Sequence, residues 1–401
     1  MTAPAAPPPG TPLPAQTGPT DAEQSTTAEQ STAEPAAAAA LWSATADRAQ
    51  QALTDHFQTR LLGPRLLLNT SPPRLGQLLT FNYWWLAHAV EVRVDGAERR
   101  GGRTAPGGTE RLRLAQQSYD GIRLRNRGRL FNHYFDDMGW LALAAVRLYD
   151  LSGERRCLDD AISLWRYIAE NGAANAPERG VAWRDSQLDY RNAPTNGAFA
   201  ILSARLASRA SDPRFDGAAN RSLEYIARTF VSGTGDLADL VADGINRQGD
   251  GALDAHWLFT YNQGLYIGAL VEAFDRTGDP ETLERATRTA RASIDRLAPT
   301  GLFLGEPANL AERGGGDAGL FKGIFVRYLG LLLDRLDPAG DGFRMLGAFL
   351  TASTDLLAPN GIPLAADDWS HPPGRTTALS TQLSAVMALE ARARFERLAL
   401  R

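Results

Sequence analysis

Two adjacent carboxylates, Asp136 and Asp137, are the strongest candidates for chemistry in this sequence. They lie in the segment 134–140 (Tyr-Phe-Asp-Asp-Met-Gly-Trp), where every other residue is aromatic, apolar or glycine. An unpaired carboxylate among apolar groups costs free energy and therefore suggests a function. The structural alternative is that an Asp at a helix start caps free backbone N–H groups and complements the helix dipole. Capping requires only one acid, so the second makes the pair a candidate catalytic site.

The pair must be positioned by the start of a helix. Met138, Leu141, Ala145 and Leu148 recur at three- and four-residue steps, which predicts a helix that begins near Asp136. Adjacent side chains in mid-helix diverge by about 100°, but this restriction relaxes at the first turn. Two neighbouring carboxylates could there flank one bond at about 5 Å, the separation used by retaining glycosidases. One carboxylate would stay ionised near the helix dipole, and burial with like-charge repulsion would keep the other protonated.

Composition limits the other classes of function. The chain has 401 residues and a formal net charge of -4, and it has no dense basic run that would suggest a nucleic acid or an anionic membrane as partner. A single cysteine, Cys157, excludes an internal disulfide, and five scattered His residues do not indicate a zinc site. We therefore expect a monomer that needs no metal or cofactor.

The N-terminal segment differs from the rest of the chain. Residues 1–40 are rich in Pro, Ala, Thr, Gln and Glu, and we expect them to be disordered, with one catalytic domain over 41–401. No basic segment followed by an apolar one marks a secretory signal, and no run is long and apolar enough to span a membrane. The expected location is the cytoplasm.

Helical periodicity alternates with Gly, Pro and Asp from Trp42 onward, whereas alternation with period two is rare. We expect an all-α protein with helices at 43–60, 76–94, 108–126, 136–150, 154–170, 194–209, 215–231, 258–276, 280–296, 319–335, 340–356 and 376–397. Twelve helices form six hairpins. They suggest a closed toroid, the (α/α)6 barrel, with an open superhelix of hairpins as the alternative.

The connections between these helices alternate in length. Similar short polar turns occur at 152–158, 211–215, 277–283 and 337–343, at steps of roughly 60 residues. The intervening segments 171–193, 232–257, 297–318 and 357–375 are long and carry aromatic and acidic residues, including Trp257 and Asp317. Long loops at one rim of a barrel are where binding residues collect, and Trp, Tyr, Asp and Asn suit a carbohydrate.

Six segments together resemble glycoside hydrolase family 76, the endo-α-1,6-mannanases. They are Phe-Asn-Tyr-Trp-Trp-Leu-Ala-His (81–88), 134–140, Val-Ala-Trp (181–183), Pro-Thr-Asn-Gly (194–197), Phe-Thr-Tyr-Asn-Gln-Gly (259–264) and Gly-Asp-Ala-Gly-Leu-Phe-Lys-Gly (316–323). The resemblance runs from about Trp42 to about Arg394. It implies an (α/α)6 barrel and a retaining mechanism on α-1,6-mannan or manno-oligosaccharide, with Asp136 as nucleophile and Asp137 as acid/base.

The resemblance also implies a set of sugar-binding residues. Eight positions would line the cleft: Trp84, Trp85, Trp183, Asn196, Asp243, Tyr261, Asn262 and Gln263. Each has a structural alternative. Trp84 and Trp85 are adjacent and face different directions on a helix, so at least one of them is expected in the core. Asn196 could cap a helix, and residues 261–263 could be the polar start of the next helix.

Three readings of function remain open. The first is hydrolysis or transglycosylation of α-1,6-mannosides, since the carboxylates do not separate the two reactions. The second is a glycan-binding protein without activity, although a binder has no need for two adjacent acids. The third is another (α/α)6 enzyme, either an epimerase, for which His88, His133 and His256 are candidate acid/base residues, or an unsaturated-uronide hydrolase. A polymer-degrading enzyme should meet its substrate outside the cell, so the missing export signal leaves open a different chain start, an imported or biosynthetic oligosaccharide as substrate, or lost activity.

Overall fold

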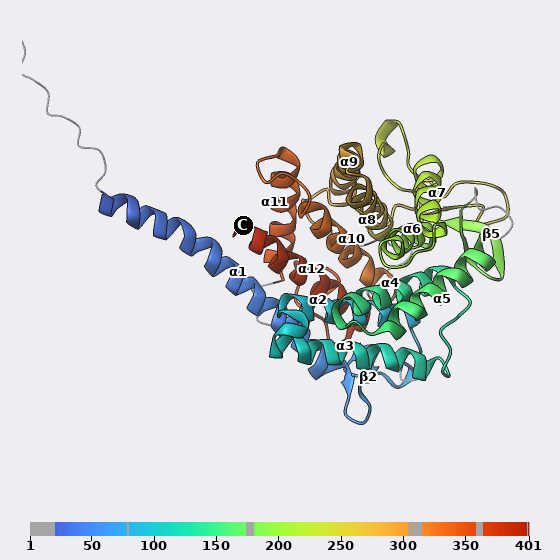
Figure 1. Cartoon of the computed structure of the whole chain (residues 1–401), viewed down its shortest axis with the longest axis horizontal. Coiled ribbons are helices and arrows are strands. Elements are labelled where there is room, and N and C mark those ends of the chain that lie inside the picture. The colour runs from blue at the N-terminus through green and yellow to red at the C-terminus, as the bar shows by residue number, and fades with distance from the viewer. Residues whose placement is uncertain are drawn as a thin grey trace, which may run out of the picture.

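The chain folds into two concentric rings of helices (Figure 1). The computed structural model describes residues 21–77, 80–173, 180–303, 306, 315–357, 364–398 and 400, with side chains from residue 34 onward. Within these residues twelve α-helices are present, and the strands are short. The all-α (α/α)6 barrel predicted from the sequence is confirmed.

Six inner helices form a closed ring, because each packs against the next and the last packs against the first. They are α2 (Tyr83–Arg99), α4 (Phe135–Ser152), α6 (Ala193–Ala207), α8 (Thr260–Thr277), α10 (Ala318–Leu333) and α12 (Leu379–Leu398). Most residues of α10 and α12 are buried, as expected for helices covered on all sides. The core therefore lies within and around this ring.

Six outer helices cover the ring; five pack mainly on one inner helix each, and α11 contacts both α10 and α12. They are α1 (Asp21–Phe57), α3 (Pro106–Arg125), α5 (Arg155–Gly172), α7 (Arg214–Thr229), α9 (Pro280–Leu297) and α11 (Asp341–Asp355). An outer helix buries one stripe only: in α9 the buried residues are Thr282, Ala286, Thr289, Ala290 and Ser293. The three- and four-residue spacing that predicted helices thus marks the face turned toward the ring.

The first helix starts earlier than expected. Helix α1 begins at Asp21, within the segment expected to be disordered, and its first half projects from the ring (Figure 1). Its described side chains first become buried at Ala39 and Trp42. Residues 1–20 of the expected disordered segment lie outside the described residues.

The second helix starts later than the predicted residue 76. It begins at Tyr83, after a short 3-10 turn at Leu75–Gln77. The side-chain amide of Asn69 donates to the carbonyls of Gln77 and Thr80 over 3.1 and 2.8 Å. These carbonyls are bound by a side chain instead of by helical N–H groups, and the chain stays irregular there.

The helices of the ring meet at a seam where the chain closes on itself. Helix α1 packs against α12, so the first and last helices are partners. Arg99 of α2 binds Glu390 of α12 at 2.7 Å and Asp47 of α1 at 2.9 Å. Gln50 of α1 also donates to Glu390, at 2.9 Å. Three helices are therefore joined at one point without any covalent link.

The connections differ at the two ends of the barrel, as predicted. Short turns follow the inner helices, and two of them use a left-handed glycine, Gly153 after α4 (φ 75°) and Gly278 after α8 (φ 70°). Longer segments precede the inner helices and carry β4 (Ala182–Arg184), β5 (Gln187–Asn192) and β6 (Gly244–Ile245), which form one antiparallel sheet. Two further pairs are β1 (Gln58–Thr59) with β2 (Gly63–Leu67), and β3 (Thr70–Ser71) with β7 (Thr377–Ala378).

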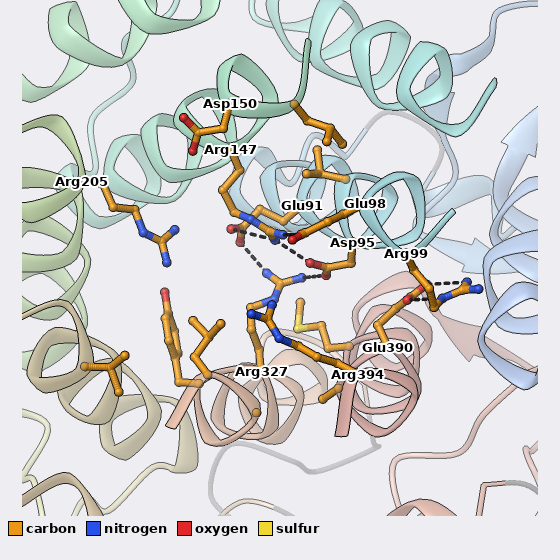
Figure 2. Close-up of a pocket in the computed structure, with 18 of the residues that line it drawn as sticks. Glu91, Asp95, Glu98, Arg99, Arg147, Asp150, Arg205, Arg327, Glu390 and Arg394 are labelled. Atoms are coloured by element: carbon orange, nitrogen blue, oxygen red, sulfur yellow. Dashed lines mark hydrogen bonds and ion pairs between the residues drawn. The ribbon is translucent and has the colours of Figure 1, made fainter. Parts of the chain in front are cut away.

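A cavity of about 550 Å³ lies at the short-turn end, and we call it the charged cavity (Figure 2). Its lining includes Glu91, Asp95, Arg147 and Arg327. Arg327 donates to Glu91 and, over 2.8 Å, to Asp95, which also lies 2.6 Å from Arg147. These residues come from α2, α4 and α10, so ion pairs tie together three inner helices near their C-terminal ends. None of the described helices is both long and apolar enough to cross a bilayer.

Candidate active site

A second cavity, of about 480 Å³, lies at the opposite, long-loop end, and we call it the cleft. Its walls come from the starts of α2, α4, α8 and α10 and from the segments before α6 and α8. Its size and its mixture of aromatic and polar groups are typical of a small-ligand site. The lining residues are Phe81, Asn82, Tyr83, Trp84, Tyr134, Asp136, Asp137, Trp140, Trp183, Tyr190, Asn192, Asp243, Arg247, Trp257, Phe259, Tyr261, Asp317 and Phe321.

Asp136 and Asp137 both line the cleft, in the first turn of α4. The N-cap residue is Tyr134, and its side chain makes no capping bond. Asp136 accepts the backbone N–H of Asp137 over 2.9 Å, so it satisfies one free donor of the first turn. Helix capping, the structural alternative, therefore explains Oδ1 of Asp136 but neither its Oδ2 nor Asp137.

The two acids have different partners. Trp183 donates its indole N–H to Asp136 Oδ2 over 3.1 Å, and Asn132 donates its amide to Asp137 Oδ2 over 2.7 Å. Asp136 thus receives two hydrogen bonds in the structure, one from the backbone and one from Trp183, whereas Asp137 receives one. Donors of this kind favour the ionised form of a carboxylate.

Both acids hold their protons more tightly than usual. Burial raises the pKa of Asp136 to about 7, although the N–H groups of Asp137 and Trp183 act in the opposite direction. Burial, followed by the negative charge of Asp136, raises the pKa of Asp137 well above its usual value. The pair therefore favours one ionised and one protonated acid near neutral pH, with Asp136 the first to ionise.

Asp243 lies in the same cleft on the segment that leads from α7 to α8. Its Oδ1 accepts the amide of Asn262 over 3.0 Å, and its Oδ2 accepts the hydroxyl of Tyr190 over 3.0 Å and an N–H of Arg247. Burial raises the pKa of Asp243, and these three donors oppose the shift. The carboxylate is thus fixed in one orientation at the wall of the cleft.

Aromatic rings form much of the remaining wall. Tyr261 stacks on Phe321 with ring centres 3.9 Å apart, and Trp84 stacks on Trp140 at 6.4 Å. Trp257 packs against the guanidinium of Arg247, 3.9 Å from the ring centre. Flat aromatic faces beside fixed carboxylates are suited to the apolar faces and hydroxyls of sugar rings.

Of the eight predicted binding positions, four line the cleft: Trp84, Trp183, Asp243 and Tyr261. The sequence also predicts that Trp183, Asp243, Tyr261 and Gln263 surround one cleft with the Asp pair; the first three line it, and Gln263 does not. Trp85 is buried beside the cleft, as expected for one of two neighbouring Trp residues. Asn262 also stays outside the lining and acts on it through its bond to Asp243.

Asn196 and Gln263 are buried and hold backbone segments in place instead of lining the cleft, which corrects the prediction for both. Asn196 accepts the N–H of Val181 and donates to its carbonyl, over 2.8 and 2.9 Å. Gln263 does the same with Val241, over 2.8 and 2.7 Å. The two amides replace missing backbone partners and so fix the segments that carry Trp183 and Asp243.

Other cleft residues were not assigned a binding role from the sequence. Tyr190, Asn192 and Arg247 belong to the small sheet or to the segment beside it, and no motif marks them. Trp257 and Asp317 lie in long loops, and this position was the sequence feature that indicated a binding role.

The three His residues weighed for an epimerase do not line the cleft. His133 and His256 are exposed, whereas His88 is buried beneath Trp84 and Trp140, with ring centres 5.6 and 4.6 Å away. Within the described residues, no three His, Cys, Asp or Glu side chains come together in a way suited to a metal ion.

A family model described as glycosyl hydrolase family 76 matches residues 41–344 of the chain. No curated protein matches the chain. Among solved structures, the Lin0763 protein of Listeria innocua is 34% identical, with a TM-score of 0.79, over 89% of this chain and 98% of that one.

Two further structures are similar. One is an inactive double Asp-to-Asn variant of the α-1,6-mannanase GH76A of Salegentibacter sp. HEL1_6 in complex with α-1,6-mannotriose. It is 29% identical, with a TM-score of 0.77, over 88% of this chain and 99% of that one. The mannosidase Bt3792 of Bacteroides thetaiotaomicron, 16% identical with a TM-score of 0.71 over 90% of this chain and 100% of that one, shares the fold.

Proposed function

The chain belongs to glycosyl hydrolase family 76, and on this premise we propose that it cleaves α-1,6-mannosidic bonds in mannan-type polysaccharide or oligosaccharide with retention of configuration. The observation that carries the proposal is the half-buried Asp136–Asp137 pair, whose members have unequal surroundings on a cleft with aromatic walls. The similar Salegentibacter mannanase, with its bound α-1,6-mannotriose, supports the choice of substrate.

Asp136 is the nucleophile in this mechanism. It ionises before Asp137, and the indole of Trp183 and the N–H of Asp137 stabilise its negative charge. Its carboxylate attacks the anomeric carbon and forms a glycosyl ester as the bond to the departing oxygen breaks.

Asp137 is the acid/base residue. Burial and the neighbouring charge keep it protonated, so it can give this proton to the departing glycosidic oxygen. Once Asp136 is esterified its charge is lost, and Asp137 ionises more easily. It can then take a proton from the water that attacks the anomeric carbon and releases Asp136.

Asp243 and the aromatic wall bind the sugar in this proposal. Asp243 is held by Asn262, Tyr190 and Arg247 and can accept sugar hydroxyls, while Tyr261 and Trp84 offer flat apolar surfaces. When a second sugar instead of water reaches the glycosyl ester, the same two acids perform transglycosylation.

Incubation with α-1,6-mannan and with α-1,6-mannotriose, followed by chromatography, tests the activity. Shorter oligosaccharides are expected, and products longer than mannotriose at high concentration would reveal transfer. Proton NMR at early times should show the α-anomer of the new reducing end first. Release of the β-anomer first would refute retention, and binding of mannotriose without any cleavage would favour the glycan-binding alternative.

A further inference from the structure

A fourth carboxylate of the cleft, Asp317, lies on the side opposite the Asp pair. It immediately precedes α10, which lies three places from α4 in the six-membered inner ring and therefore across the barrel. Asp317 is exposed and belongs to the cleft lining. It also acts on the pair, because its negative charge contributes to the raised pKa values of Asp136 and Asp137.

The indole groups of two adjacent tryptophans converge on one oxygen of Asp317. Trp84 Nε1 lies 3.1 Å and Trp85 Nε1 2.8 Å from Oδ1. Consecutive residues on a helix rarely point at one atom, yet the indoles of these two meet at the same oxygen. Both donors are used on a single oxygen, which fixes the orientation of the carboxylate, and no hydrogen bond to Oδ2 is found among the described residues.

Local structure does not explain this arrangement. Asp317 is the N-cap residue of α10, a position where an Asp side chain usually accepts a backbone N–H of the first turn. Here the side chain makes no capping bond and is turned toward the indoles and the cleft. The stabilisation normally gained from a cap is absent, and a fixed, exposed acceptor on a substrate cleft takes its place.

We propose that Asp317 binds sugar hydroxyls through Oδ2 and places the substrate against the Asp pair from the opposite wall. Trp85 is a positioning residue for Asp317, since it donates to the carboxylate but does not line the cleft. The inference rests on the proposed function and adds to the Asp pair and Asp243 a fourth acid with a separate task. It also gives the cleft a negative wall on each side, which favours neutral glycans over phosphorylated ones.

Binding without turnover tests the proposal first. An Asp136→Asn, Asp137→Asn parent is titrated with α-1,6-mannotriose by calorimetry, and Asp317→Asn or Asp317→Ala is then added. Asn keeps an acceptor for both indoles but replaces charged hydrogen bonds by neutral ones, so Kd should rise about tenfold. Ala removes the acceptor, and Kd should rise about a hundredfold. Trp85→Phe should give an intermediate rise.

Two controls separate substrate binding from a structural role. Asp185→Asn removes a carboxylate outside the cleft lining, whose partner is the exposed His133, and should leave Kd unchanged. Thermal unfolding of Asp317→Asn should match the parent, because the indoles keep their partner. In the otherwise active enzyme, Asp317→Asn should also shift the basic limb of the pH profile of kcat/KM to lower pH, since a like charge near Asp137 is removed.

The outcomes are distinct. If the parent binds mannotriose and Asp317→Asn binds it equally well, the inference about Asp317 is overturned while the proposed function stands. Weaker binding accompanied by a lower Tm and altered tryptophan fluorescence would show that Asp317 only supports the indoles, which also overturns it. If the parent does not bind mannotriose, the choice of substrate fails.

Discussion

The indole N–H of Trp183 lies 3.1 Å from Oδ2 of Asp136 and joins strand β4 to the first turn of α4. Trp183 reaches this position because Asn196 holds the neighbouring Val181 by both its N–H and its carbonyl. A buried core amide thus determines where a donor meets the acid that we assign as nucleophile.

This contact gives the first prediction, which concerns pH. Trp183→Phe removes a donor that favours ionised Asp136, so the pKa of Asp136 should rise. The acid limb of the kcat/KM profile should therefore move to higher pH by about half to one unit. Asn132→Ala should instead move the basic limb upward, because Asn132 favours ionised Asp137. If Trp183→Phe moves the basic limb instead and Asn132→Ala moves the acid limb, the roles of Asp136 and Asp137 must be exchanged.

The second prediction separates the roles of the two acids by chemical rescue. With an aryl α-mannoside whose leaving group needs no proton, Asp137→Asn should accumulate the glycosyl ester and, with azide, give the α-mannosyl azide by double inversion. Asp136→Asn, treated in the same way, should give the β-azide by single inversion. NMR of the two azides decides the assignment. Full activity of both variants would place the active site elsewhere.

The third prediction tests the structural role of Gln263. Gln263→Leu leaves the buried N–H and carbonyl of Val241 without this partner and should lower the free energy of unfolding by about 2–4 kcal/mol. Denaturant titration measures the loss. The exposed pair Gln51–Asp55 provides the control, since Gln51→Leu should change stability by less than about 0.5 kcal/mol. A raised Kd for mannotriose at unchanged stability would show that Gln263 binds substrate after all.

The fourth prediction concerns the ion pairs of the charged cavity. Burial tends to raise the pKa of Glu91, but Arg327, His88 and Arg147 outweigh it and hold the pKa well below the usual value. Arg327→Met leaves Glu91 buried without its main partner and should cost about 3–5 kcal/mol at neutral pH. The exposed pair Arg344–Asp341 is the control, with an expected loss of at most about 1 kcal/mol for Arg344→Met.

The sign of the pH dependence follows from the same pair. Because the folded protein lowers the pKa of Glu91, the ion pair stabilises the fold above the ordinary pKa of 4.5 and loses this effect as the pH falls below it. The deficit of Arg327→Met should therefore be largest at neutral pH and shrink as the pH falls, because the buried and stranded Glu91 can then take up a proton. A deficit that grows on acidification would contradict this assignment.

The helices could be predicted because their signal is local. Apolar residues at three- and four-residue steps marked most of the buried faces, and the repeated turns marked the short-turn end. The early part of α1 and the late start of α2 escaped because neither depends on periodicity. The early part of α1 projects from the ring. The start of α2 follows a segment whose Gln77 and Thr80 carbonyls accept the side-chain amide of Asn69, a residue between β2 and β3.

The site was harder to predict because motifs give residue types but not directions. Asn262 and Gln263 are neighbours in one motif, yet one orients Asp243 and the other holds Val241. Asp317 resembles an ordinary N-cap in sequence, and only its bonds to Trp84 and Trp85 separate it from one. Such distinctions depend on side-chain rotation about a helix axis, which sequence spacing leaves undetermined at the first turn.

At the seam between α1, α2 and α12 the first and last helices pack together. The helices therefore form a closed ring, although no peptide bond joins its two ends. Helix α1 is the outer partner of α12, and Trp42 near the start of its buried part packs under the guanidinium of Arg392 near the end of α12. The two ends of the folded unit therefore meet at the short-turn end, far from the cleft. A flexible linker from the end of α12 to residue 39 would close the chain, and a new opening at the exposed turn Gly278–Asp279 would create a circular permutant with the same ring of helices. The cleft should therefore depend on the cyclic order of the helices and should survive in such a permutant, which mannotriose binding would measure.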